Sequence, residues 1–257
     1  FAEFGSYNSD YMRHKEPAGD FPTALLQLGP DYYWMNQIGM TADNSSSNKA
    51  VRIDNWRPDI GPRVINVEKE TYRYLFGLRG TTDGGWDWET AVLHSKATSE
   101  DLTENRLSNS LLQAGLNDST SNAINIFDAN VATALAPAIV DVSRNDTSEL
   151  SSFDFKMTNP EVFNMPAGPV GMLLGFEYRA ESYTDDRDPR LDGTIQFTSA
   201  VTGLGFPFVG DVLGSSPTVD TSAKRSTNSV FAEMVLPISS KMEAQVAMRH
   251  EDPDDTK

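Results

Sequence analysis

The sequence predicts an all-β fold, built from antiparallel, up-and-down strands of a transmembrane β-barrel with long extracellular loops. Three observations support this prediction. Apolar and polar residues alternate with a period of two over many stretches, as in strands whose two faces meet different surroundings. Short turn-forming segments join these stretches in pairs, and long polar segments separate the pairs. Short turns at one end and long loops at the other are typical of membrane barrels.

Composition excludes several classes of protein. The chain has 257 residues, enough for one large domain, and 39% of them are hydrophobic with a mean hydropathy of -0.42. It contains no apolar run long enough to cross a bilayer as a helix, which excludes a helical membrane protein. Membrane strands remain compatible with this composition, because each strand carries only a weak hydropathy signal.

Charge and cysteine content exclude further functions. The net charge is -16 and the isoelectric point is near 4.5, so no nucleic-acid partner is expected. The absence of cysteine excludes disulfides, thiolate catalysis and cysteine-ligated metal sites.

The first strand signal is at residues 1–7, and the first complete hairpin is at residues 71–95. Apolar side chains share one face of its first strand; they are Tyr72, Tyr74, Phe76 and Leu78. The turn at 81–85 contains Asp-Gly and Gly-Gly, which readily take the positive φ of hairpin turns. On one face the return strand carries Trp86, Trp88, Thr90 and Val92, and on the other it carries Asp87, Glu89, Ala91 and Ser95.

The same unit recurs twice. A second hairpin joins residues 153–157 to 171–179 through a turn at 159–169. A third joins 230–236 to 242–248 through 237–240, and the polar residues 251–257 are expected to form a loop.

Two long polar segments, Ser108 to Val140 and Tyr183 to Thr227, are predicted to be extracellular loops. Within or beside them, residues 107–116 and 130–139 have the apolar spacing of short helices. Loops of this length argue against a compact soluble domain, whereas a surface-exposed barrel accommodates them.

Several segments together resemble the barrel of proteobacterial TonB-dependent receptors. They are Tyr-Arg-Tyr-Leu-Phe-Gly-Leu-Arg-Gly at 72–80, Trp-Asp-Trp-Glu-Thr-Ala at 86–91, Asn-Arg-Leu-Ser-Asn at 105–109, Gly-Phe-Glu-Tyr-Arg-Ala-Glu-Ser-Tyr at 175–183, Asp-Asp-Arg-Asp-Pro-Arg-Leu-Asp-Gly-Thr-Ile at 185–195, Gly-Ser-Ser-Pro-Thr at 214–218 and Ser-Val-Phe-Ala-Glu at 229–233. In this order they cover most of residues 64–251.

The resemblance implies a barrel of 22 strands in the bacterial outer membrane, closed by a plug and energised by a TonB-type energy-coupling protein. Such receptors actively import bulky nutrients such as siderophore-iron complexes, haem or oligosaccharides. At about 25 residues per strand and connection, residues 1–257 supply seven to ten strands, with no plug and no coupling box. We therefore expect one unit, a partial barrel whose two ends are cuts. Its expected partners are the remainder of the same receptor, outer-membrane lipid and a small-molecule or oligosaccharide ligand.

Tyr32, Tyr33 and Trp34 are candidate ligand-binding residues. Exposed aromatic rings in a loop offer a large contact area for a sugar ring or an aromatic chelator at little entropic cost. Packing inside the loop, or a place in an aromatic girdle, is the favoured alternative.

Asp185, Asp186, Asp188 and Asp192 are candidate ligands for a loop calcium ion, because calcium takes several carboxylate and carbonyl oxygens. Their spacing does not match an EF-hand, and Arg187 and Arg190 can neutralise the same carboxylates. Structural ion pairing is therefore favoured over a metal site, and no other cofactor is expected.

No motif predicts an enzyme: the chain has no Gly-x-Ser-x-Gly elbow and its three histidines lack ligand spacing. Two alternatives remain. A soluble all-β carbohydrate-binding or glycosidase domain would also show alternating strands and acidic loops. A passive porin would share the strands, and only the family-like segments and the loop lengths favour an active importer over it.

Overall fold

The computed structural model describes residues 1–13, 26–39, 51–53, 58–198 and 203–256. A single seven-stranded antiparallel sheet dominates them, and each strand pairs with the one before it in the order β1-β4-β5-β6-β7-β8-β9. Its strands are β1 (Ala2–Arg13), β4 (Arg63–Thr81), β5 (Asp87–Leu107), β6 (Ile139–Met165), β7 (Gly168–Arg187), β8 (Thr221–Ser239) and β9 (Met242–Thr256). The prediction of antiparallel up-and-down strands is confirmed.

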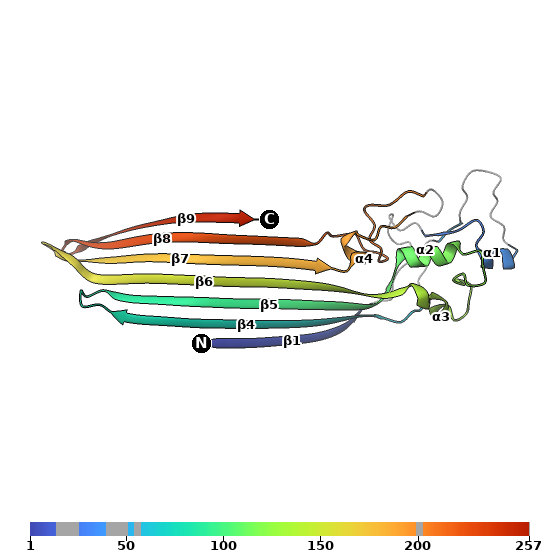
Figure 1. The fold of residues 1–257 in the computed structure, drawn as a ribbon, viewed down its shortest axis with the longest axis horizontal. Coiled ribbons are helices and arrows are strands. Elements are labelled where there is room, and N and C mark those ends of the chain that lie inside the picture. The colour runs from blue at the N-terminus through green and yellow to red at the C-terminus, as the bar shows by residue number, and fades with distance from the viewer. Residues whose placement is uncertain (14–25, 40–50, 54–57, 199–202, 257) are drawn as a thin grey trace.

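The helices of the described residues lie at one end of the sheet, and the short turns that join the strands lie at the other (Figure 1). The helical end holds α1 (Tyr33–Gln37), α2 (Asn109–Asn117), α3 (Val131–Leu135), the 3-10 helix η1 (Ala136–Ala138), α4 (Pro189–Asp192) and the small pair β2 (Gln27–Leu28) and β3 (Val51–Arg52). The helices expected at 107–116 and 130–139 are thus confirmed. In the described part of the chain, no helix combines the length and the apolar character needed to cross a membrane.

The strands are longer than predicted. Residues 183–187 and 221–227 belong to β7 and β8 and not to a loop, and residues 251–256 continue β9. The turn expected at 159–169 shrinks to two residues, because β6 runs on to Met165. Where both faces of a strand are polar, alternation disappears from the sequence, while the neighbouring strands still supply the hydrogen bonds of the ladder.

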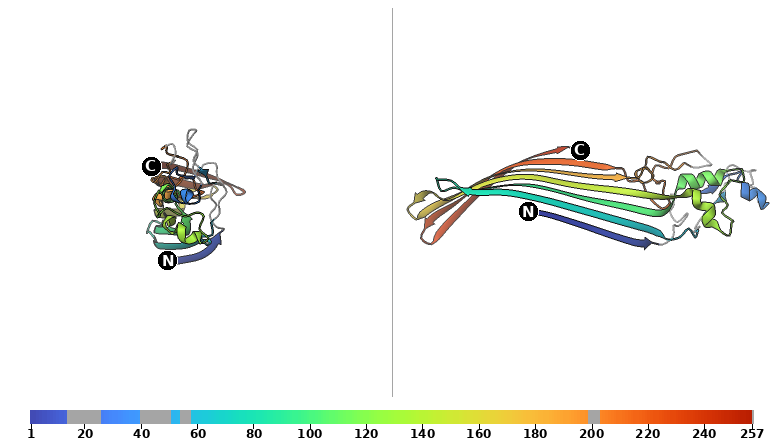
Figure 2. Two further views of the ribbon diagram at one scale, coloured as in Figure 1. Left: turned by 90° about the vertical axis from the view of Figure 1, so that its right-hand side faces the viewer. Right: turned by 60° about the horizontal axis from the view of Figure 1, so that its bottom comes forward.

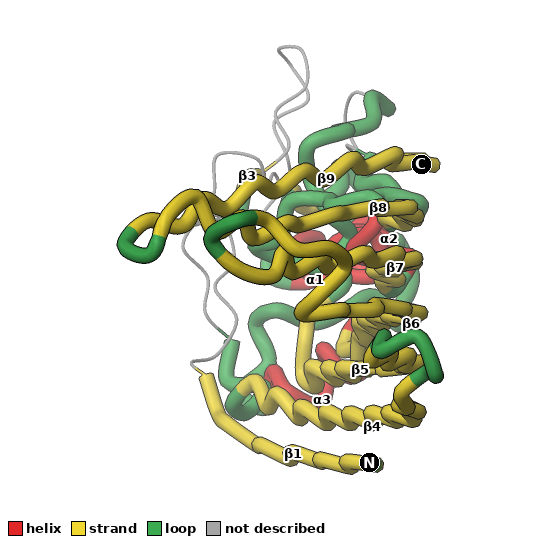
Figure 3. Tube along the Cα trace, turned by 90° about the vertical axis from the view of Figure 1, so that its left-hand side faces the viewer, coloured by secondary structure: helices red, strands yellow, loops and turns green. Residues whose placement is uncertain are grey.

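The buried hydrophobic core is formed mainly by residues of the loops and short helices. These segments lie at one end of the sheet and not against its middle (Figure 2). We call the loop residues around this core, 26–39, 51–53, 58–62, 108–138, 188–198 and 203–220, the cap. Buried members of the core are Leu26, Leu28, Tyr32, Met35, Ile53, Ile60, Leu107, Leu112, Leu116, Ala123, Ile124, Leu135, Ala138, Phe197, Val209 and Leu213. Viewed from the turn end, the strands form one layer with the cap behind it (Figure 3). Among the described residues no pairing joins β1 to β9, so the sheet is open.

Candidate functional site

One face of the sheet, which we call the aromatic face, carries an apolar belt across all seven strands. Register fixes its members, because residues paired across an antiparallel ladder point to the same side. One row pairs Phe76 with Val92, Val92 with Phe153, and Phe153 with Tyr178. The belt contains Phe4, Tyr72, Tyr74, Phe76, Leu78, Trp88, Val92, Phe153, Phe155, Met157, Met172, Leu174, Phe176, Tyr178, Val230, Ala232, Met234, Leu236, Ala244, Val246 and Met248.

The belt is exposed in this chain. Phe76 is 65% exposed and Met248 is 73% exposed, and Phe153 and Phe176 contact each other at a centroid distance of 6.2 Å without anything above them to bury their rings fully. Contiguous apolar surface of this extent on a monomer marks an interaction site or a membrane-facing surface.

The belt has a defined height along the strands. On β4 it spans the seven residues from Tyr72 to Leu78 and then gives way to Glu70 on the cap side. At about 3.3 Å per residue this corresponds to about 20–25 Å.

The belt also drifts across the hydrogen-bonded register. On β1 the belt residue nearest the cap is Phe4, which pairs with Tyr72 on β4. On β9 the belt residue nearest the cap is Met248. Following the strand pairings from Met248 across the sheet leads through Trp88 on β5 to Gly80 on β4. Tyr72 and Gly80 are eight residues apart, over the six steps from β1 to β9. The belt therefore shifts by about 1.3 residues per strand, which is about 4 Å along the strands for each step of about 4.8 Å between strands. With this shift the belt lies parallel to a membrane plane when the strands tilt by about 40° from the membrane normal.

The opposite face, the charged face, carries paired ions at the level of the belt. Lys156 donates to Glu89 at 2.7 Å, and Arg249 lies 3.1 Å from Glu177. The Arg249 guanidinium also lies 5.4 Å from the centre of the Phe231 ring, in a cation–π arrangement.

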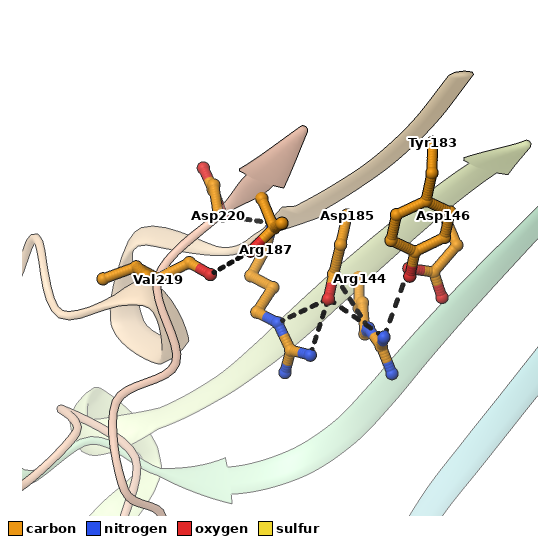
Figure 4. A network of polar contacts seen from close by, with 8 residues as sticks. Arg144, Asp146, Tyr183, Asp185, Arg187, Val219 and Asp220 are labelled. Atoms are coloured by element: carbon orange, nitrogen blue, oxygen red, sulfur yellow. Dashed lines mark hydrogen bonds and ion pairs between the residues drawn. The ribbon is translucent and has the colours of Figure 1, made fainter. Parts of the chain in front are cut away.

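Nearer the cap, an arginine–aspartate network occupies the charged face (Figure 4). Asp185 is 7% exposed and accepts two hydrogen bonds from Arg144, at 2.9 and 3.0 Å, and further ones from Arg187. These hydrogen bonds, first those of Arg144, hold the pKa of Asp185 below its ordinary value. Tyr183 donates to Asp146 at 3.1 Å, which raises the pKa of its hydroxyl.

The structure does not bring the four candidate calcium ligands together. Asp186 points to the opposite face from Asp185, and Asp188 caps α4 by accepting from the Arg190 N–H at 2.8 Å. Asp192 accepts from the backbone N–H of Thr194 at 2.6 Å. Within the described ranges, no group of three or more acidic or histidine side chains is placed to hold a metal ion. The ion-pairing interpretation applies to Asp185 with Arg187, whereas Arg190 pairs with Asp211 instead.

The aromatic triplet packs in the cap. Tyr32 is fully buried and donates its hydroxyl hydrogen to the Ile124 carbonyl, and burial raises its pKa. Its ring therefore presents no face to a ligand, and the favoured alternative, packing inside the loop, applies to Tyr32. Trp34 donates to the Ala123 carbonyl at 2.8 Å, and Tyr33 meets Trp34 edge to face at 5.0 Å. Both are only partly buried, and a stacking role for them stays a prediction.

Asp211 is a buried hub that sequence reasoning missed. It is fully buried and pairs with Arg190 from the segment after β7. It also accepts from the Ser108 hydroxyl at 2.7 Å and from the Ser110 N–H at 2.8 Å, at the start of α2. Ser108 before an apolar helical run is a recognisable N-cap signal, but nothing local marks Asp211 as its partner.

No protein-family model matches the chain, and no curated protein matches it significantly.

Proposed function

We propose that the chain is part of the transmembrane β-barrel of a TonB-dependent outer-membrane receptor, an active importer of a bulky nutrient such as a siderophore-iron complex, haem or an oligosaccharide. The observation that carries the proposal is the apolar belt. The strand tilt of about 40° that levels the belt agrees with transmembrane barrels, whose strands tilt by about 35–45°.

In this proposal the aromatic face meets lipid and the charged face lines a watery lumen. The short turns, such as residues 82–86, then lie in the periplasm and the cap lies outside the cell. Beyond the belt, β5 continues from His94 to Leu107, which is about 40 Å along the strand. A bulky ligand would therefore meet the cap well before it reached the membrane.

The unpaired edges of β1 and β9 need partners, because unsatisfied backbone groups within hydrocarbon cost several kcal/mol each. The remaining strands of the same receptor would pair with them. A plug and a TonB-type energy-coupling protein would complete the transport cycle, and the chain has no catalytic role in it.

The two alternatives make different demands on the belt. A soluble carbohydrate-binding or glycosidase domain would have to cover the belt or leave it in water, and no described element packs over it. A passive porin would use the same belt. It differs in that uptake would not depend on an energised inner membrane.

Cell fractionation of the full-length protein tests the proposal. We expect it in the outer-membrane pellet, resistant to carbonate extraction and released only by detergent. Recovery in a soluble periplasmic or secreted fraction would overturn the proposal. If the protein is found in the outer membrane, nutrient uptake that persists after the proton gradient is collapsed would favour the passive porin.

A further inference from the structure

Lys69, Arg73 and Arg79 lie on the charged face of β4, on the turn side of Arg63. They occupy alternating-face positions of one uninterrupted strand and are all exposed. None of them makes an ion pair or a hydrogen bond with a described side chain. At about 3.3 Å per residue, the steps between them are about 13 and 20 Å, so the column runs from above the belt to its turn-side edge.

This column contrasts with the other cations of the same face. On β6, β7 and β9 each described cation is neutralised: Lys156 by Glu89, Arg179 by Glu181, Arg249 by Glu177, and Arg144 and Arg187 by Asp185. The ion pair between Lys156 and Glu89 also leaves Arg79 without an acidic partner among the described residues. Glu89 stands directly opposite Arg79 in the β4–β5 register, but Lys156 on the next strand holds its carboxylate at 2.7 Å.

On β5, Ser99 stands opposite Lys69 and Ser95 stands opposite Arg73, whereas Glu89 stands opposite Arg79. On β1, Glu3 stands opposite Arg73 without forming an ion pair. Unneutralised cations along a confined surface attract anions from solution, and rings or rows of Lys and Arg select anions in pores.

We propose that Lys69, Arg73 and Arg79 form a binding track for an anionic solute that bears carboxylate or phosphate groups. The inference rests on the proposed function, in which the charged face lines the transport path, and it assigns the cargo to the anionic class. The alternative occupant is an acidic segment of the same receptor, which the experiment below distinguishes.

Lysine labelling of the purified full-length protein in detergent tests occupancy of the track. The probe is citrate, with sucrose as the neutral control. We expect citrate to slow acylation of Lys69 by an amine-reactive reagent, while sucrose leaves it unchanged and the ion-paired Lys156 responds to neither. Lys69 that is unaffected by citrate, whether freely reactive or already shielded by another segment, would overturn the proposal.

Titration calorimetry measures the citrate affinity of two matched variants. Arg73→Gln should weaken binding about fivefold, the effect of one charge contact at about 4 Å in water, and salt should weaken wild-type binding. Arg179→Gln, which removes a cation already paired with Glu181, should leave citrate affinity unchanged. Equal affinities for the two variants would overturn the track. Because binding is measured in detergent, this failure is separate from a failure of outer-membrane fractionation.

Discussion

Arg144 on β6 and Asp185 on β7 form a two-point hydrogen-bonded ion pair, with Arg144 Nε and Nη2 at 2.9 and 3.0 Å from the two carboxylate oxygens. Arg187 approaches the same carboxylate from its other side at 2.8 Å. The pair joins two long strands just where they reach the cap. It thereby couples the position of the cap to the register of the sheet.

Asp185→Asn should destabilise this junction by about 1.5–3 kcal/mol, the range for hydrogen bonds to charged groups. The folded-state pKa of Asp185 is lowered, so its contribution is fully present above an unfolded-state pKa of about 3.9 and is lost as the pH falls through the lower folded value. Thermal unfolding of the full-length protein between pH 7 and 2 measures both effects. The control is Asp186→Asn on the opposite face, and equal midpoints for the two variants would contradict the assigned role.

Val92→Arg should impair insertion or stability much more than Ala91→Arg. The two residues are adjacent, and a one-residue step moves a side chain to the other face. Val92 lies in the belt, where arginine costs about 2–4 kcal/mol near the bilayer midplane, whereas Ala91 lies on the charged face. The folded fraction in outer membranes measures the difference. Equal tolerance at the two positions would show that the belt does not face lipid.

Single-cysteine labelling should report the topology, because the chain has no cysteine of its own. Phe208→Cys in the cap, at a position that is 78% exposed, should react with a membrane-impermeant maleimide on intact cells. Asp83→Cys in the turn between β4 and β5 should react only after the outer membrane is permeabilised. The reverse pattern would invert the proposed orientation.

Asp211→Asn should loosen the cap while leaving the sheet intact. The substitution removes the charge that neutralises Arg190 and weakens the contacts to Ser108 and Ser110, and breaking a buried pair in this way costs about 3 kcal/mol. Protease treatment of outer-membrane vesicles should then cut the cap faster than in wild type. Asp220→Asn is the control, since that exposed carboxylate accepts one backbone N–H, from Arg187. Identical cutting rates for Asp211→Asn and wild type would contradict the role of Asp211 in stabilising the cap.

Gly175→Ala should lower the unfolding temperature, because a Cβ there would lie 2.1 Å from the Phe231 ring. Overpacking of this kind costs about 1–3 kcal/mol. Gly5→Ala has no atom within 4 Å and should have no such cost. Replacing Phe231 by Leu in the Gly175→Ala background should recover part of the loss. If Gly175→Ala left the unfolding temperature unchanged and Phe231→Leu did not raise it in that background, the close packing of Phe231 against Gly175 would be contradicted.

The sequence by itself determined the faces of the strands and the pairing of neighbours. Alternation is a local property, so Tyr74, Phe76 and Val92 could be assigned to one side, and Asp83-Gly84 could be read as a turn, without knowledge of any distant contact. The same reasoning underestimated strand lengths, because strands that are polar on both faces carry no periodic signal.

Only the tertiary structure decided the features that depend on residues far apart in the chain. The drift of the belt needs the register of all seven strands, and the pairing of Asp185 with Arg144 needs the register of β6 against β7. Burial of Tyr32 and the contacts of Asp211 arise where separate loops fold together into the cap. The unpaired state of Arg79 depends on Lys156, two strands away, holding Glu89, since a charge is free or neutralised according to its neighbours in space.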